Sequence, residues 1–198
     1  MYSNRKKELH LSFNAPVTLI FSALCLIACV IIQAVGNKAV RAVFSVYRAP
    51  LGDPLTWVRL VTYVLGHAGW DHLIGNLMFI LLLGPMIEEK YGSKNTVIII
   101  LATAVVTGAV NMVFFPRVAL LGASGVVFAF ILISSVTVRE DNTIPVTFIL
   151  VALLYLGREI YDGITVKDDV SQMAHIIGGA VGSVLGFLLS KAGKKDRF

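Results

Sequence analysis

Long apolar blocks separated by short polar segments limit what this chain can fold into. A helix needs roughly 20 mainly apolar residues to cross the hydrocarbon core of a bilayer, and blocks of about this length recur along the chain. The chain is 57% hydrophobic and 15% charged, whereas a soluble domain carries about 25% charged residues. The sequence therefore predicts an all-α polytopic membrane protein with six transmembrane helices. The predicted spans cover residues 16–36, 69–87, 95–115, 122–138, 143–161 and 171–190.

The spans divide the chain into one membrane domain with short tails. We expect a cytoplasmic N-terminal tail over residues 1–15, a membrane domain over 16–190 with a long outer loop at 37–66, and a basic tail over 191–198. The first apolar block is longer than the 7–15-residue core of a signal peptide, and no small-residue cleavage motif ends it. We therefore expect this block to stay in the protein as a span.

The basic residues indicate the orientation of the chain in the membrane. Lys and Arg are enriched in the cytoplasmic loops of membrane proteins, and the two sides of this chain differ. The distribution predicts a multi-pass protein of the cell membrane with both termini in the cytoplasm. The expected inner side carries Arg5, Lys6, Lys7, Lys90, Lys94, Arg139, Lys191, Lys194, Lys195 and Arg197, and the outer side carries Lys38, Arg41, Arg48, Arg59, Arg117, Arg158 and Lys167.

Composition also excludes some classes of partner and cofactor. The net charge is +5, but no basic patch is interleaved with stacking aromatics, so nucleic-acid binding is not expected. Cys25 and Cys29 lie one helical turn apart in the first span. Without histidines nearby in the sequence they are a poor metal signature, and buried Cys usually behaves as a small hydrophobe. We therefore expect lipid as the surroundings and no cofactor.

A serine between glycines opens the fourth predicted span. Ser124 lies in the segment Gly122-Ala123-Ser124-Gly125, directly before an apolar run. Such a serine either packs against a neighbouring helix or acts as a nucleophile. His175 is the only histidine inside the last span, and a serine and a histidine on two spans favour hydrolysis within the membrane.

The predicted orientation brings four polar residues to one depth. With the N-terminus inside, the second, fourth and sixth spans all begin on the outer side. His72 and Asn76 lie at the start of the second span, Ser124 at the start of the fourth and His175 at the start of the sixth. Polar groups within a membrane are costly and usually face the bundle interior or a water-filled cavity. The four residues therefore predict one shared site in the outer half of the bilayer.

Helix geometry indicates how these residues could bind a developing negative charge. His72 and Asn76 are four residues apart, so they share a helix face and can direct two donors at one developing charge. Ser124 at a helix start has unpaired backbone N–H groups nearby, which suit an anion. A structural role remains open, because a serine in a span often bonds to its own helix.

Small residues recur every four positions in the last span. Ala174, Gly178, Gly182 and Gly186 form a stripe that allows a neighbouring helix to come close. His175 adjoins the start of this stripe, so the helix that carries the histidine is suited to tight packing. The span that begins at Ser124 is the expected neighbour, and such packing permits the 2.6–3.2 Å that a general base requires to its nucleophile.

Together these motifs resemble the rhomboid family of intramembrane serine proteases. His67, His72 and Asn76 fit the family pattern H-x4-H-x3-N, and the segment around Ser124 fits G-x-S-G. His175, followed by Gly178 and Gly182, fits the motif of the last span. The resemblance covers roughly residues 55–190 and implies a rhomboid-like helical bundle.

The resemblance also implies roles for individual residues. Ser124 would be the nucleophile and His175 the general base, while His72, Asn76 and the backbone N–H of Ser124 would stabilise the oxyanion. His67 would support an outer water cavity. The further matching positions are Glu88 as a structural carboxylate, Phe128 as the residue stacking on the catalytic histidine, and Trp57 with Arg59 as a loop pair that a valine separates here.

The activity implied is a serine-type endopeptidase that cuts single-pass transmembrane proteins near the outer membrane face. Three other classes stay open. An inactive rhomboid-like protein would bind transmembrane clients without cutting them, although such proteins typically lack the serine or the histidine. His67, His72 and His175 could instead bind zinc. A small transporter or channel would show internal repeats or broken helices near the midplane, and no convincing repeat is present.

Overall fold

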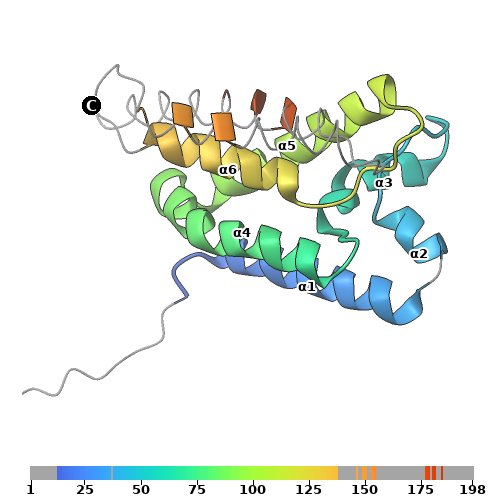
Figure 1. Cartoon of the computed structure of the whole chain (residues 1–198), viewed down its shortest axis with the longest axis horizontal. Coiled ribbons are helices and arrows are strands. Elements are labelled where there is room, and N and C mark those ends of the chain that lie inside the picture. The colour runs from blue at the N-terminus through green and yellow to red at the C-terminus, as the bar shows by residue number, and fades with distance from the viewer. Residues whose placement is uncertain are drawn as a thin grey trace, which may run out of the picture.

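The computed structural model describes residues 13–36 and 38–137, and ten single positions beyond them: 146, 149, 150, 153, 154, 177, 178, 180, 181 and 184. Within this part of the chain the regular structure is helical, apart from an isolated antiparallel β-bridge between Val46 and Leu120. The fold is therefore all-α, as predicted (Figure 1). The helices are α1 (Pro16–Val35), α2 (Lys38–Val43), α3 (Pro54–Thr62), the 3-10 helix η1 (Tyr63–Leu65), α4 (Trp70–Tyr91), α5 (Ser93–Phe114) and α6 (Ser124–Thr137).

Three of these helices are long and apolar enough to cross a membrane. They are α1 with 20 residues, α4 with 22 and α5 with 22. α6 contributes a shorter apolar helix, Ser124–Ser134. The first three predicted spans are thus confirmed as membrane-length helices, and the chain is a multi-pass membrane protein. The predicted spans at 143–161 and 171–190 lie largely outside the described residues.

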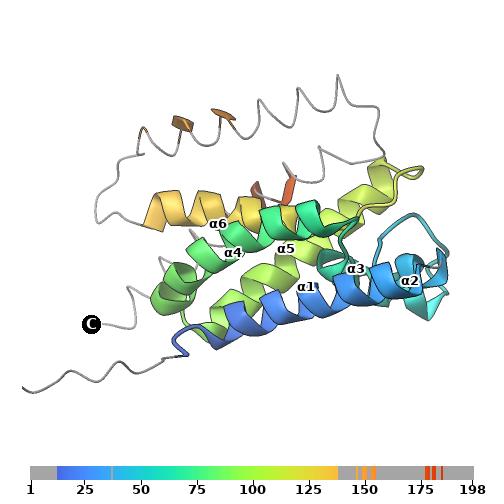
Figure 2. The same cartoon turned by 60° about the horizontal axis from the view of Figure 1, so that its bottom comes forward.

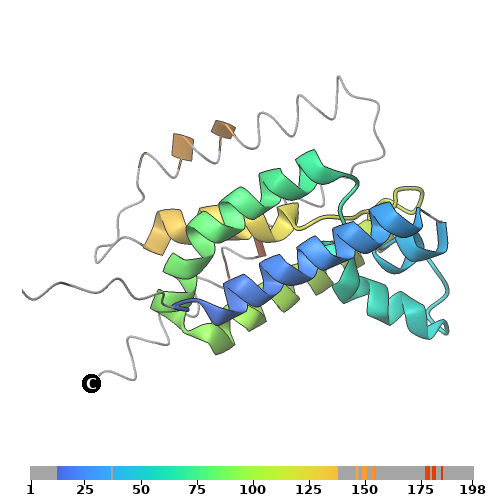
Figure 3. The same cartoon turned by 90° about the horizontal axis from the view of Figure 1, so that it is seen from below.

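The three long helices and α6 pack side by side, with their axes roughly along the length of the molecule (Figures 2 and 3). α4 packs against α1, α5 and α6, and α5 also packs against α6. Large apolar side chains on the outer faces of α1 and α4, among them Ile20, Ile27, Met78 and Leu82, are exposed. In a membrane helix such exposed apolar side chains contact lipid, because the hydrocarbon core of the bilayer contains no water.

Glu88 joins the start of α1 to the end of α4. Its carboxylate accepts hydrogen bonds from Val17 N at 3.0 Å, Thr18 N at 2.9 Å, Thr18 Oγ1 at 2.9 Å and Ser93 Oγ at 2.7 Å. Ala15, the N-cap residue of α1, offers no side-chain cap. Glu88 therefore satisfies backbone N–H groups that a helix start leaves unpaired and fixes α1 antiparallel to α4.

These contacts also explain why α4 ends later than predicted. The sequence places the end of this span at residue 87, but the helix continues to Tyr91. A carboxylate is expected to end a span because burial without partners is costly. Here Glu88 is only 4% exposed, and its oxygens are fully engaged, so the helix continues through it.

Replacing Glu88 with alanine is expected to lower the free energy of unfolding by about 3 kcal/mol, because several buried donors lose a charged acceptor. The matched control is Glu89→Ala, since Glu89 is the exposed neighbour on the same helix. Thermal unfolding of both variants in detergent measures the difference. Equal melting temperatures for the two variants would contradict the role of Glu88 as the link between α1 and α4.

Residues 38–66, which belong to the predicted loop 37–66, contain short helices that the sequence interpretation did not anticipate. α3 begins after Asp53, whose carboxylate accepts a hydrogen bond from Leu55 N at 3.0 Å, and Pro54 occupies the first turn. An Asx cap followed by proline is a standard helix start. The segment therefore forms regular structure at the end of the bundle where α1 ends and α4 begins.

The side chains of Trp57 and Arg59 lie in different surroundings. Trp57 is 57% exposed and donates to Leu51 O at 3.0 Å. Arg59 is buried, donates to Ala42 O at 2.9 Å and lies with its guanidinium 4.7 Å from the centre of the Tyr47 ring. Val58 therefore lies between an exposed aromatic residue and a buried cation. The buried Arg59 of α3 contacts α2 through Ala42 and the segment after α2 through Tyr47.

Candidate active site

The loop that leads into α6 is anchored at several points before it reaches Ser124. Leu120 exchanges two backbone hydrogen bonds with Val46, of 2.8 and 2.9 Å, and Gly122 N donates to Tyr63 O at 2.9 Å. Gly122 has a φ of 121°, a region that side chains rarely adopt. Ser124 follows as the first residue of α6 and is 9% exposed. The nucleophile candidate therefore lies on a fixed turn at a helix start.

Two anchoring residues were not singled out from the sequence. Tyr63 holds Gly122 through its carbonyl, and its hydroxyl donates to Ala104 O of α5 at 3.0 Å. Asn111 donates through Nδ2 to Val46 O at 3.3 Å and to Val118 O at 3.0 Å. The sequence could have indicated Asn111, because a single amide within an apolar span usually has a specific hydrogen-bond partner.

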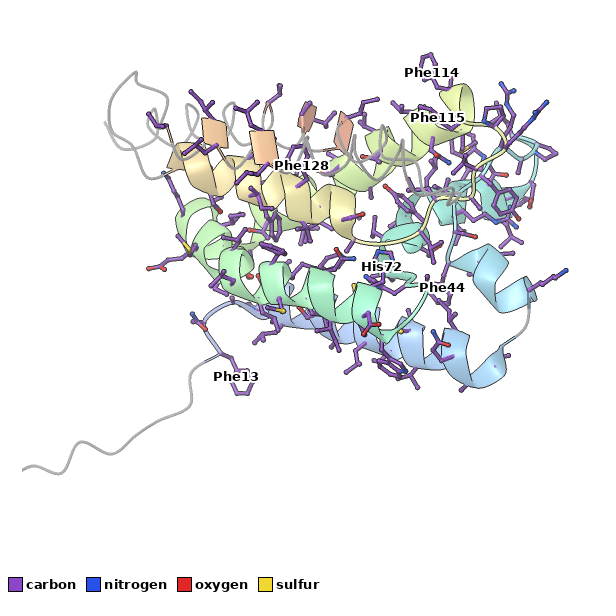
Figure 4. All side chains as sticks on the ribbon, in the orientation of Figure 1. Phe13, Phe44, His72, Phe114, Phe115 and Phe128 are labelled. Carbon is purple, nitrogen blue, oxygen red and sulfur yellow. The ribbon has the colours of Figure 1, made fainter. Side chains whose placement is uncertain are left out.

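His72 and Asn76 meet the loop that carries Ser124. A Cβ added at Gly122 would lie 2.8 Å from His72 Nε2 and 3.8 Å from Asn76 Nδ2. Any side chain at Gly122 would therefore collide with the His72 ring. In Figure 4 the labelled His72 lies where the start of α4 comes close to α6. The structure thus brings three of the four candidate residues to one end of the bundle, on two helices that begin there.

Asn76 presents a buried hydrogen-bond donor for which the described residues offer no acceptor. Its side chain is 7% exposed, and its Nδ2 is buried with no hydrogen-bond partner within the described residues. Leaving a buried amide donor unpaired costs about 1–3 kcal/mol, so such groups call for an explanation. A donor held ready for a transient negative charge is one such explanation.

The neighbours of His72 indicate which of its ring nitrogens carries the proton. Ala68 N donates to His72 Nδ1 at 3.5 Å, so Nδ1 acts as an acceptor. In a neutral imidazole the other nitrogen is then the donor, and the tautomer follows from this network. His72 Nε2, the nitrogen closest to Gly122, therefore carries the N–H.

His67 is a fully buried neighbour of this ring. Its exposure is 0%, its Nδ1 lies 3.0 Å from Leu65 O, and its ring meets His72 edge to face at 5.0 Å between centroids. Burial, followed by the proximity of His72, lowers the pKa of His67 to about 4. His67 is therefore neutral at physiological pH and adds no positive charge beside His72.

His67 and His72, two of the three imidazoles of the zinc alternative, lie within the part of the chain that the structure describes. No group of three His, Cys, Asp or Glu side chains there has a metal-binding arrangement. Cys25 and Cys29 are buried free thiols in α1, and Cys25 Sγ lies 3.8 Å from Val64 O. His175, the third imidazole of the zinc alternative, lies outside the described residues.

Although His175 is not described, one position of its span is placed against α6. A Cβ added at Gly178 would lie 3.2 Å from Gly125 Cα and 2.5 Å from Thr107 Oγ1. The expected close approach of the glycine stripe to the span that begins at Ser124 is therefore confirmed at Gly178. Gly178 follows His175 by three residues in the sequence, and Gly125 directly follows Ser124.

Comparison with known proteins identifies the family of the chain. The rhomboid domain model matches residues 54–192, which is more than half of the chain and includes every candidate site residue. The chain belongs to the rhomboid family. This assignment confirms the resemblance drawn from the motifs around His72, Ser124 and His175.

The relatives of this rhomboid protein come from distant organisms. "Rhomboid-like protein 11, chloroplastic" of Arabidopsis thaliana is 32% identical over 68% of this chain and 53% of its own length. "Rhomboid-related protein 2" of Mus musculus is 29% identical over 69% of this chain and 52% of its own length. "Rhomboid protease GlpG" of Haemophilus influenzae is 27% identical over 94% of this chain and 97% of its own length. The chain thus spans about half the length of the first two relatives and nearly all of the third.

Proposed function

We propose that this rhomboid protein is an intramembrane serine endopeptidase that cuts single-pass transmembrane proteins near the outer membrane face. The observation that carries the proposal is the convergence of His72 Nε2 and Asn76 Nδ2 on Gly122, two residues before Ser124. These are two N–H donors from one helix face beside a candidate nucleophile at a helix start. Relatives named as proteases support the same reaction class.

In the proposed reaction Ser124 Oγ attacks the scissile carbonyl while His175 accepts the hydroxyl proton. The negative charge that develops on the carbonyl oxygen is stabilised by His72 Nε2–H, Asn76 Nδ2–H and the backbone N–H of Ser124. The tetrahedral intermediate collapses, and His175 returns the proton to the leaving amine. A water activated by His175 then hydrolyses the acyl-enzyme and releases the second fragment.

The packing of Gly178 supports the pairing of Ser124 with His175. A Cβ added at Gly178 would lie 3.2 Å from Gly125 Cα, so the two backbones come close, and a helix through residues 171–190 would bring its outer turns beside the start of α6. With the span at 143–161, this helix would complete a bundle of six. Both termini would lie in the cytoplasm, because the basic residues of the tails and of the α4–α5 junction mark that side.

The depth of the site predicts how substrates are cut. His72, Asn76 and Ser124 lie within the first turns of their helices, and one turn rises about 5.4 Å. Cleavage is therefore expected within roughly two turns of the outer surface. A substrate helix must unwind there, and Gly or Pro lowers helix stability by about 1 or 3 kcal/mol relative to Ala.

The test compares two model single-pass substrates of equal length, one Leu-rich and one with Gly or Pro near its outer end. The purified protein in lipid vesicles should cut the second substrate faster, and mass spectrometry of the fragments should place the cut near the outer end. Equal rates with cleavage at the bilayer centre would contradict both the depth of the site and the need for unwinding.

A further inference from the structure

The last turns of α1 carry a glutamine that contacts the loop before α4. Gln33 lies in the apolar run Val30-Ile31-Ile32-Gln33-Ala34, outside the segment that the rhomboid domain model matches. Its Nε2 donates to Ala68 O at 3.1 Å and would lie 4.0 Å from a Cβ added at Gly69. An amide of the first helix therefore holds the peptide group that precedes α4.

The same peptide segment also contacts the ring of His72. Ala68 accepts from Gln33 through its carbonyl and donates to His72 Nδ1 through its N–H at 3.5 Å. Gly69, the N-cap residue of α4, makes no side-chain cap bond. Ala68 itself is exposed, so it has little packing to hold it. Gln33 of α1 thus bonds the carbonyl on one side of the Ala68 Cα, and His72 of α4 accepts from the N–H on the other side.

We propose that Gln33 is a positioning residue, which through Ala68 fixes the orientation and the tautomer of His72. The chain of contacts runs from Gln33 Nε2–H to Ala68 O, from Ala68 N–H to His72 Nδ1, and from His72 Nε2–H towards the space beside Gly122. This inference rests on the proposed role of His72 as an oxyanion donor. It extends the site to α1, a helix that contributes none of the candidate catalytic residues.

The tautomer matters because the two ring nitrogens have opposite roles. With Nδ1 as acceptor, Nε2 carries the proton and can donate to a developing negative charge. In the other tautomer His72 Nε2 would present a lone pair to that charge, which would be repulsive. The Ala68 N–H and C=O belong to adjacent peptide groups, so Gln33 acts on the N–H by fixing the position of the Ala68 backbone as a whole. Without the Gln33 bond this backbone could shift and lengthen the 3.5 Å contact to Nδ1, so both tautomers would be populated. Gln33 keeps the ring in the donating form before the substrate arrives.

Gln33→Leu tests this role, because leucine keeps the length and removes the donor. We expect kcat to fall about three- to tenfold, as loss of a single hydrogen bond suggests, with KM nearly unchanged. Gln33→Lys, which keeps an N–H donor of similar reach, should recover much of the rate. Asn95→Leu is the matched control, because Asn95 Nδ2 donates to the backbone carbonyl of Tyr91 at 2.8 Å, at the other end of α4.

A second measurement reads the tautomer without relying on catalysis. The side-chain ¹⁵N signals of His72 in histidine-labelled protein, assigned by their loss in His72→Ala, should show Nε2 protonated in the wild type. Gln33→Leu should shift them towards a mixture of tautomers, while Asn95→Leu leaves them unchanged. Unchanged His72 signals in a folded Gln33→Leu variant overturn the inference, whatever the rate does. An inactive wild type would overturn the proposed function and leave this spectroscopic result standing.

Discussion

Ser124→Ala and His175→Ala should each lower the rate of substrate cleavage on the order of 10⁴-fold or more, and the double variant should lose no more than either single variant. Residues that act as one catalytic unit behave in this non-additive way, since neither side chain functions without the other. Rates of fragment formation from a model single-pass substrate in lipid vesicles give all three values.

Ser134→Ala is the matched control for this series. Ser134 is a buried serine on the same helix as Ser124, 9% exposed, and its Oγ makes no hydrogen bond within the described residues. This variant should keep nearly the full rate. Losses that multiply in the double variant would show that Ser124 and His175 act independently and would contradict the proposed dyad.

Asn76→Ala is expected to lower kcat by about 10²–10³-fold, the usual cost of one oxyanion donor, with little change in KM. The contact forms mainly in the transition state, so its loss affects turnover rather than substrate binding. Stability should change little or improve, because the variant removes a buried Nδ2 that has no partner within the described residues. Steady-state kinetics and thermal unfolding of the same preparation provide both readouts.

Asn95→Ala controls for loss of an amide at the opposite end of α4, where Asn95 contacts Tyr91 O. It should keep kcat within about twofold, because the half-buried Asn95 lies beside the end of α4, far from His72 and Asn76. If Asn76→Ala raises KM and leaves kcat unchanged, Asn76 is a substrate-binding residue, and the proposed oxyanion role is wrong.

The membrane helices were predictable because their signal is local. Length and apolar content alone identify α1, α4 and α5 to within a few residues. The end of α4 was not predictable in the same way, because three of the hydrogen bonds that satisfy the buried Glu88 come from Val17 and Thr18, about 70 residues away in the sequence. The short helices α2 and α3 were missed because residues 37–66 were assigned as a loop on the absence of a long apolar block, and short helices need no such block.

The candidate site shows the same division between local and long-range information. Helix spacing predicts that His72 and Asn76 share one face, and the predicted orientation puts them at the expected depth of Ser124. The sequence does not show that Gly122 fits against the His72 ring, or that Tyr63 and Asn111 hold the loop before Ser124. These contacts join segments that are distant in the sequence, so no periodic pattern predicts them.

The central claim, that Ser124 is an activated nucleophile, is tested most directly by covalent modification. A fluorophosphonate reacts with a serine hydroxyl only when a base and an oxyanion site activate it. After treatment of the folded protein in detergent, peptide mass mapping should locate the added phosphonyl group on Ser124 alone. His175→Ala should prevent the modification. An unmodified Ser124 in protein that cuts a transmembrane substrate, or modification that persists in His175→Ala, would contradict the account.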